Sequence, residues 1–336
     1  MERVTIAHLA EQLGISKASV SYALNGQPGV SDQTRERVLA LADELGWHPS
    51  FSARALSRSR TDAIGMVLRR DPSLLGTELY YMRLLEGVEG ALTEAGQSLL
   101  LRMVGTAPGR DSAVYERWAA ERRVDGVIVL DRTIDDQRPA QLEKLGMPFV
   151  LHGVLPADED GVELIEDQHH DAELLVWHLS ELGHRNIAHI TGPLHLAHEI
   201  DRADAVRAQC RTRGITARFA EADYTYDTAY ARVVELLEST TPPTALIFSN
   251  DIMAMAGHRA LSDRGIDDVA MVSWDDSMLC QFASPAITAL ERFPDRSGRR
   301  SAVMLLAQLD GTEPDLTGPS ISELRVRATS TPAPRG

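Results

Sequence analysis

From residue 63 to about residue 290 the sequence alternates short apolar runs with longer amphipathic stretches, and this pattern restricts the fold more than any other feature. It is typical of βαβ units, in which parallel strands are covered by helices on both faces. A helix is expected from about 78 to 95. Strands are expected at 64–68, 98–103, 124–130, 149–151, 162–165, 187–190, 245–248, 269–273 and 287–290.

Two similar stretches indicate that this α/β part has two halves. One predicted helix ends in Ala95-Gly96 before a strand, and another ends in Leu182-Gly183 before a strand. A chain of 336 residues is also long enough for two or three domains. We expect a core over 62–330, with one parallel-sheet subdomain at about 62–158 plus 291–320 and a second at about 159–290 plus the C-terminal segment. The tail at 331–336 is expected to be loose.

The first 46 residues have a different, purely helical pattern. Apolar positions at a spacing of 3.6 predict three short helices. Each has a capping residue at its start and a glycine where a left-handed residue ends a helix: Thr5, Ser16 and Ser31, then Gly14, Gly26 and Gly46. We therefore expect an all-α head at 1–46, followed by a hinge helix or linker at 47–61.

The first two helices, with the turn Gly14-Ile15-Ser16 between them, form a helix-turn-helix pattern. In the second helix Val20 and Leu24 face inward, which leaves an outer face made of Lys17, Ala18, Ser21 and Tyr22. On that face a lysine can donate to guanine and an alanine can contact a thymine methyl, while Ser16 and Ser19 can hold phosphates. The alternative is an ordinary three-helix bundle with a solvated face.

The charge is distributed unevenly along the chain. Its formal sum is −15, but residues 1–61 hold 7 basic and 6 acidic side chains, and residues 50–61 hold three arginines and no carboxylate. A phosphate backbone is best tolerated in this region.

Several motifs then point to one family. In the head these are Val4-Thr5-Ile6-Ala7-His8-Leu9-Ala10, Gly14-Ile15-Ser16, Ala18-Ser19-Val20-Ser21, Leu24-Asn25-Gly26 and Pro49-Ser50-Phe51-Ser52-Ala53-Arg54-Ala55-Leu56. In the core they are Leu182-Gly183-His184-Arg185, Gly192-Pro193, Asn250-Asp251, Trp274-Asp275-Asp276 and a final strand at Arg327. With these motifs the chain resembles the LacI/GalR repressors over nearly its whole length.

The resemblance implies a homodimer, or a dimer of dimers, that reads a pseudo-palindromic operator in double-stranded DNA. Leu56 would be an apolar wedge in the minor groove. The positions that the resemblance and the helix-turn-helix face assign to DNA contact are Thr5, Ser16, Lys17, Ala18, Ser19, Ser21, Tyr22, Asn25, Ser31, Ala53, Arg54 and Leu56. Many family members have Arg at the position of Tyr22, so we expect an atypical half-site.

In the core the resemblance implies a fold like that of periplasmic sugar-binding proteins, with a small-molecule effector in the cleft between the halves. Ligands bind beyond the carboxyl ends of parallel strands, so residues just after strands are candidates. The expected effector residues are Arg69, Asp71, His152, Arg202, Asn250, Asp251, Asp275 and Arg292, with Arg202 and Asp275 gripping vicinal hydroxyls. His152-Gly153 stands where the family usually shows an Asp-Arg pair, which predicts a specialised pocket.

We therefore predict a DNA-binding transcriptional regulator, most simply a repressor, whose effector is a sugar. A purine- or nucleoside-responsive regulator and a cytosolic sugar-binding protein are the alternatives.

No enzyme, cofactor or metal is expected, because no catalytic constellation stands out and only His195, His198 and Glu199 gather possible ligands. Cys210 and Cys280 are expected to be reduced. No apolar run approaches the length of a membrane span and no secretory signal is visible, so a cytoplasmic location is expected.

Overall fold

The computed structural model describes residues 4–24, 26–47, 60–70, 78–107, 109–153, 167–316, 322–330 and 332. The chain divides into two compact units, Met1–Asp62 and Ala63–Gly336. Some expected features lie outside the described residues: the strand at 162–165, most of the linker and tail, and the site candidates Asn25, Ala53, Arg54, Leu56 and Asp71.

The smaller unit is a three-helix head in its described part. Its helices are α1 (Ile6–Leu13), α2 (Lys17–Leu24) and α3 (Asp32–Glu44). Their shared core is small, with Leu9, Val20 and Val38 fully buried. The predicted caps are confirmed: the hydroxyls of Thr5, Ser16 and Ser31 each accept a hydrogen bond from the backbone N–H three residues later. The three predicted glycines have φ values of 60° to 67°.

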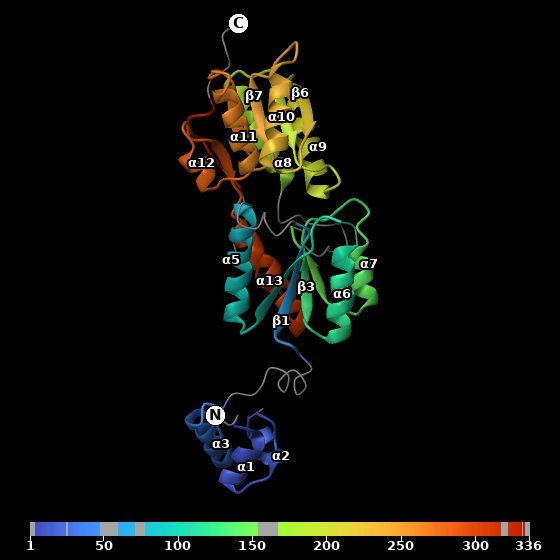
Figure 1. Cartoon of the computed structure of the whole chain (residues 1–336), viewed down its shortest axis with the longest axis vertical. Coiled ribbons are helices and arrows are strands. Elements are labelled where there is room, and N and C mark those ends of the chain that lie inside the picture. The colour runs from blue at the N-terminus through green and yellow to red at the C-terminus, as the bar shows by residue number, and fades with distance from the viewer. Residues whose placement is uncertain are drawn as a thin grey trace. The chain divides into compact units, whose positions relative to one another are not determined.

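The first half of the larger unit is a parallel four-stranded sheet in the order β2-β1-β3-β4 (Figure 1). Its strands are β1 (Ala63–Leu68), β2 (Ser98–Met103), β3 (Gly126–Val129) and β4 (Phe149–Leu151). Its helices are α5 (Leu79–Glu94), α6 (Arg110–Glu121), α7 (Arg138–Lys144) and α13 (Pro294–Asp310). Every residue of β1 is buried, because helices cover both faces of the sheet.

The second half is a six-stranded sheet in the order β10-β9-β8-β7-β5-β6. Its strands are β5 (Asn186–Thr191), β6 (Thr216–Glu221), β7 (Ala245–Phe248), β8 (Ala270–Ser273), β9 (Thr288–Glu291) and β10 (Glu323–Arg325). Its helices are α8 (Gln168–Glu181), α9 (Ala197–Thr212), α10 (Tyr226–Leu237), α11 (Asp251–Ser262) and α12 (Met278–Phe282). Separate apolar clusters fill the two faces of this sheet.

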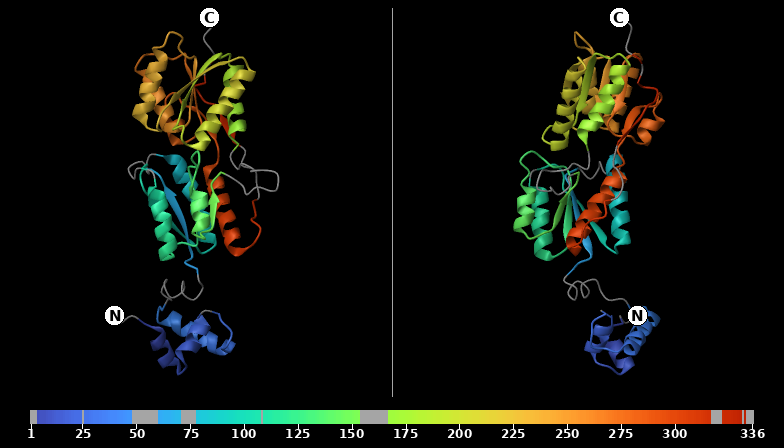
Figure 2. Two further views of the ribbon diagram at one scale, coloured as in Figure 1. Left: turned by 90° about the vertical axis from the view of Figure 1, so that its right-hand side faces the viewer. Right: turned by 180° about the vertical axis from the view of Figure 1, so that it is seen from behind.

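Helix α13 follows the second sheet in the chain but packs in the first half, beside α5 (Figures 1 and 2). Two glycines make this contact close. A Cβ on Gly87 would lie 1.7 Å from the carbonyl oxygen of Asp295, and a Cβ on Gly298 would lie 2.2 Å from that of Leu84. No side chain fits at either position. The chain then returns to the second sheet as β10, so it passes between the halves three times.

The two halves also meet through a main-chain contact that we call the loop bridge, formed by residues 132–134 and 195–197. Thr133 and Leu196 form an isolated antiparallel bridge. The N–H of Ile134 donates to the carbonyl of His195 at 3.2 Å, and the N–H of Ala197 donates to the carbonyl of Arg132 at 2.8 Å. The bridge therefore joins the segment after β3 to the start of α9.

The structure corrects two expectations about strands. Strand β6 was not predicted, because its sequence is half polar, as suits a strand at the edge of the sheet. The expected final strand at Arg327 is wrong: β10 ends at Arg325 and runs antiparallel to β9. Arg327 instead leaves the strand to form an ion pair with Asp276 at 2.6 Å.

Candidate functional site

The outer face of α2 is the candidate DNA interface in the head. Lys17, Ala18 and Tyr22 are exposed, while Val20 and Ala23 on the inner face are buried. The hydroxyls of Ser16 and Ser19 lie 2.9 Å apart at the helix start. This arrangement places polar donors at a helix N-terminus, where backbone N–H groups favour a phosphate.

The remaining described candidates in the head lie at the edges of this face. Thr5 and Ser31 are exposed and cap α1 and α3, and Ser21 is half-buried. The ring of Tyr22 lies close to Gly29, where an added Cβ would be 3.3 Å from the ring. Gly29 has φ 118°, which suits glycine. The loop after α2 thus supports the aromatic ring on the interface.

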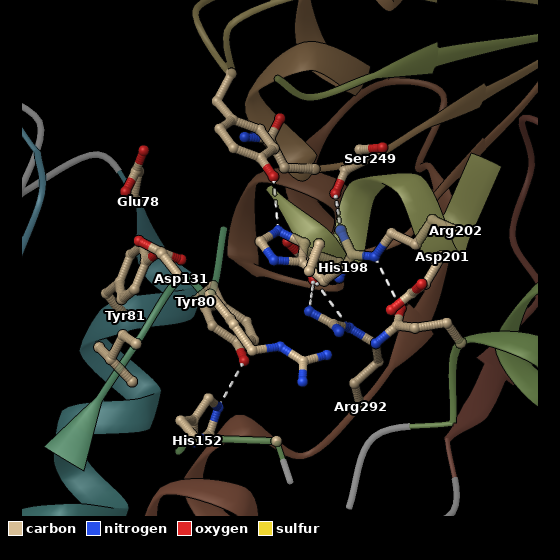
Figure 3. Close-up of a pocket in the computed structure, with 18 of the residues that line it drawn as sticks. Glu78, Tyr80, Tyr81, Asp131, His152, His198, Asp201, Arg202, Ser249 and Arg292 are labelled. Carbon is tan, nitrogen blue, oxygen red and sulfur yellow. Dashed lines mark hydrogen bonds and ion pairs between the residues drawn. The ribbon is translucent and has the colours of Figure 1, made fainter. Parts of the chain in front are cut away.

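The larger unit holds a pocket between its halves (Figure 3). Its walls come largely from residues that follow strands of both sheets and from the first turns of α5, α9 and α11, as expected for ligand sites of parallel sheets. The lining residues are Arg70, Glu78, Tyr80, Tyr81, Leu130, Asp131, Arg132, His152, Gly153, Gln168, Ala197, His198, Asp201, Arg202, Tyr224, Ser249, Asn250, Asp251, Asp275 and Arg292.

A charged cluster around Arg70 forms the wall on the side of the first half. The Arg70 guanidinium lies 2.9 Å from a carboxylate oxygen of Asp131 and 3.2 Å from one of Glu78, and it donates to the Tyr81 hydroxyl at 2.9 Å. Burial opposes ionisation of Asp131, but Arg70, His198 and the hydrogen bond from Tyr81 together outweigh burial and lower the pKa of this carboxyl. Arg70 also lies 5.7 Å from the centre of the Tyr224 ring, which belongs to the other half.

The opposite wall contains Arg202, on α9. Its Nη1 donates to Glu199 at 2.9 Å and its Nε donates to Gln168 at 2.9 Å. The guanidinium lies over the buried ring of Trp274, 5.1 Å from the ring centre. These contacts hold a positive charge at the surface of the pocket in a fixed orientation.

Residues after β7, β8 and β9 form the third wall. Arg292 forms an ion pair with Asp275 at 2.7 Å and lies 4.9 Å from the centre of the Tyr80 ring. Asn250 caps α11 through its side-chain oxygen, which leaves its amide NH₂ group for a ligand. Oδ2 of Asp251 is buried and has no hydrogen-bond partner among the described residues. Burial and the charge of Asp275 raise the pKa of Asp251 to about 6.

His152 lines the pocket below Tyr80. Its Nε2 lies 3.3 Å from the Tyr80 hydroxyl (Figure 3). Its Nδ1 lies 2.9 Å from the Ser301 hydroxyl on α13. Both ring nitrogens therefore hold the tyrosine and the helix in place.

Six of the expected effector residues thus line one pocket: His152, Arg202, Asn250, Asp251, Asp275 and Arg292. Arg69 does not line it. Arg69 and Arg70 directly follow β1, and neighbouring side chains of an extended strand point to opposite sides. Arg69 therefore lies 3.9 Å from Asp111, while Arg70 faces the pocket. Arg202 and Asp275 share the pocket but have different ion-pair partners, Glu199 and Arg292.

The cysteines and the histidine cluster take part in the protein's own structure. Cys210 and Cys280 are buried and form no disulfide. His198 contacts the Tyr224 hydroxyl at 2.9 Å, and Glu199 is engaged by Arg202. Over the described part of the chain, no group of three or more His, Cys, Asp or Glu side chains is arranged to hold a metal ion. In that same part, no helix has both the length and the apolar character that a membrane crossing requires.

Comparison with known proteins identifies the family. Residues 5–50 match the model of the bacterial regulatory proteins of the lacI family, and residues 176–330 match a periplasmic binding protein-like domain. The HTH-type transcriptional regulator CelR of Thermobifida fusca is 32% identical over 325 residues, which cover 93% of this chain and 94% of that protein. The chain belongs to the lacI family. It is therefore a DNA-binding transcriptional regulator, and the family is not one of enzymes.

Other members of the lacI family and solved structures agree. The HTH-type transcriptional repressor PurR of Vibrio atlanticus is 28% identical over 91% of this chain and 92% of that protein. A structure of a CelR–cellobiose complex matches 97% of this chain and all of that chain, with a TM-score of 0.70 and 28% identity. The lac repressor dimer bound to operator and the anti-inducer ONPF matches 98% of this chain and all of that chain, with a TM-score of 0.83 and 24% identity, and so supports the fold.

Sequence reasoning missed several lining residues of this lacI-family pocket, notably Tyr81, Asp131 and Tyr224. Tyr224 follows β6, which lacks the apolar pattern of a strand, so nothing marked it as a residue after a strand. Asp131 directly follows the strand expected at 124–130 and lies two residues after β3, so it could have been found by the same rule that selected Asn250 and Asp275.

Proposed function

We propose that this protein is a repressor whose affinity for its operator is controlled by an uncharged sugar bound in the pocket between the two halves. The observation that carries the proposal is the chemistry of the pocket. Each of Arg70, Arg202 and Arg292 already has a carboxylate partner within the protein. A charged group on the ligand is therefore not needed to neutralise the site.

The walls provide the contacts that a sugar requires. The rings of Tyr80, Tyr81 and Tyr224 offer apolar faces for C–H groups. The carboxylates of Asp251 and Asp275 and the amide of Asn250 offer acceptors and donors for hydroxyl groups. The solved CelR–cellobiose complex shows a related protein with such a ligand.

We propose the head, residues 1–46, as the DNA-reading domain and 47–61 as the hinge that inserts Leu56 into the minor groove of a pseudo-palindromic operator. Lys17, Ala18 and Tyr22 on α2 would face base edges, while Ser16 and Ser19 would contact phosphates. Two heads are needed for a palindrome, so the protein would act as a homodimer in the cytoplasm.

Residues 62–330 would sense the effector. The pocket takes residues from both halves, so a bound sugar favours the arrangement in which the halves approach each other. A ligand can control the hinge only to the extent that it binds one arrangement of the two halves more tightly than the other. Coupling free energies between two such sites are about 1–3 kcal/mol. We propose that the sugar disorders the hinge and releases the operator.

Two measurements test this function. The first follows the unfolding temperature with glucose, cellobiose, glucose 6-phosphate, hypoxanthine and adenosine, because a ligand of the folded state raises stability. We expect stabilisation by a neutral sugar and none by the sugar phosphate. Stabilisation by a purine or nucleoside alone would replace the sugar as effector.

The second measurement selects an operator from random DNA and compares its affinity with and without the stabilising compound. We expect a salt-dependent affinity that falls when the sugar is present. An affinity that rises would make the compound a co-repressor. Absence of any specific DNA sequence would overturn the role of the head.

A further inference from the structure

We infer that Glu199 is a positioning residue for effector recognition: it fixes Arg202 and Tyr224 for the ligand without touching the ligand itself. The inference rests on the proposed function in taking Arg202 as an effector contact. The starting observation is that the Glu199 side chain is fully buried, although it carries a charge. A buried carboxylate is stable only when charges and donors around it replace water.

Four donors surround the Glu199 carboxylate and leave it no capacity for a ligand. Oε1 accepts from Arg202 at 2.9 Å and from the Tyr224 hydroxyl at 2.9 Å. Oε2 accepts from the N–H of Gly192 at 2.6 Å and from the Ser249 hydroxyl at 2.7 Å. These donors come from α9 and from the segments after β5, β6 and β7. Glu199 thus joins four chain segments at the carboxyl edge of the second sheet.

The carboxylate keeps its charge at all ordinary pH values. Burial alone would raise its pKa, but Arg202 and the nearby histidines outweigh burial and lower the pKa of Glu199 to about 2. The ion pair with Arg202 is therefore permanent at neutral pH, and the guanidinium has a constant orientation.

That orientation leaves one edge of the guanidinium for the ligand. Nη1 of Arg202 donates to Glu199 and to the Ser249 carbonyl, and Nε donates to Gln168. Among the described residues none accepts from Nη2, and Arg202 lines the pocket (Figure 3). With Glu199 in place, Nη2 points in a direction set by three bonds and by the Trp274 ring.

Glu199 also holds the tyrosine that contacts the other half. The Tyr224 ring lies against Gly192, where an added Cβ would be 2.3 Å from the ring, and its hydroxyl bonds to Glu199. The ring also meets Arg70, across the pocket, with the guanidinium carbon 5.7 Å from the ring centre. One carboxylate therefore orients a ligand contact and a contact between the halves.

The test uses Glu199→Gln, with Glu221→Gln as the matched control. A glutamine has one acceptor oxygen and one NH₂ group in place of the two carboxylate oxygens. The NH₂ group would face two hydrogen-bond donors that now bond to a carboxylate oxygen, and the negative charge beside Arg202 would be lost. Glu221 lies in the same half and accepts from the N–H of Leu194 at 2.8 Å, but it is exposed and does not line the pocket. Circular dichroism verifies that each variant is folded, and Glu199→Asp, which keeps the charge, serves as the conservative variant.

The first readout needs no ligand. The Nε–Hε signal of Arg202 in ¹⁵N NMR, assigned by its loss in Arg202→Lys, reports whether the guanidinium stays ordered. We expect the signal to shift or disappear in Glu199→Gln, to persist in Glu221→Gln and to recover in part in Glu199→Asp. An unchanged signal in folded Glu199→Gln would overturn the positioning role, whatever the effector is.

The second readout is the affinity for cellobiose. We expect Glu199→Gln to lose about 10- to 100-fold in the protein and less than about 3-fold in an Arg202→Gln background, because residues that act through one another are not additive. Equal losses in both backgrounds would overturn the inference. Failure of the wild-type protein to bind cellobiose, combined with a changed Arg202 signal, would exclude cellobiose as the effector and leave the positioning role standing.

Discussion

Asp251 is a pocket residue whose charge changes with pH close to neutrality. Burial and Asp275 raise its pKa from the ordinary value of 3.8 to about 6. The folded protein therefore holds the proton more tightly than the unfolded chain does. Binding of this proton adds to the free energy of unfolding. Its contribution is fully present below about pH 4 and is lost as the pH rises through 6.

Asp251→Asn should remove this pH dependence. We expect the variant to gain up to about 3 kcal/mol over the wild type between pH 4 and pH 7, because two pKa units correspond to that energy. Urea unfolding of both proteins at several pH values measures the difference, which cancels the titration of all other groups. If the difference in free energy of unfolding between the two proteins stayed constant over this pH range, it would contradict the raised pKa.

At the scale of residues, the sequence located part of the pocket for a physical reason. Asn250 and Asp275 follow strongly apolar strands, so their position at the edge of a sheet could be predicted. Which of Arg69 and Arg70 lines the pocket could not be predicted, since it depends on which side of the chain faces the pocket. Glu199 was considered only as a metal ligand, because its role depends on donors from distant segments.

At the scale of elements, α2 places its polar face outward because its apolar residues are needed in a very small core. Lys17→Ala should weaken binding to the selected operator about 10- to 100-fold, the usual cost of losing a lysine contact to a base. Fluorescence anisotropy at fixed salt measures this. Lys144→Ala, at an exposed position at the end of α7, is the control. An equal loss in the two variants would show that Lys17 contributes only to the general charge.

The start of α9 allows a test of the loop bridge. Ala197 is the first residue of α9 and follows the extended Leu196, so proline fits there without harm to the helix. Ala197→Pro removes the N–H that donates to Arg132. We expect a folded protein with an effector affinity reduced about 3- to 10-fold, which corresponds to one lost hydrogen bond.

Titration with the identified sugar and small-angle X-ray scattering check this expectation. Ala197→Gly keeps the N–H and should stay close to the wild type. The bridge would have no part in bringing the halves together if the proline variant bound the sugar as well as the glycine variant.

Element boundaries were predictable where helices end in glycine and strands are apolar. Thr5, Ser31 and Gly14 defined the helices of the head correctly. Strands β6 and β10 lie at the two edges of their sheet, where one side is free of neighbours and polar residues are allowed. A pattern based on apolar runs cannot find such strands reliably.

At the scale of the whole molecule, α12 presents an unusual surface. Met278 is 59% exposed and Phe282 is 79% exposed, although both are large and apolar. Exposed apolar side chains that lie together often mark contacts between proteins. We expect Phe282→Asp to weaken the proposed homodimer and, with it, the affinity for the proposed two-fold operator. Sedimentation velocity and operator titration measure both, and a variant that remains a dimer would exclude this surface from the interface.

The position of α13 also has a consequence for the order in which the protein is made. The apolar face of the first sheet that α5 covers also needs Ala302, Met304 and Leu305 of α13 to be complete. These residues leave the ribosome after the strands β5 to β9 of the second half. On the ribosome, the head can therefore fold early, whereas the half synthesised next keeps apolar surface exposed until nearly the entire chain has been translated. We therefore expect the nascent chain to need protection by chaperones during this interval.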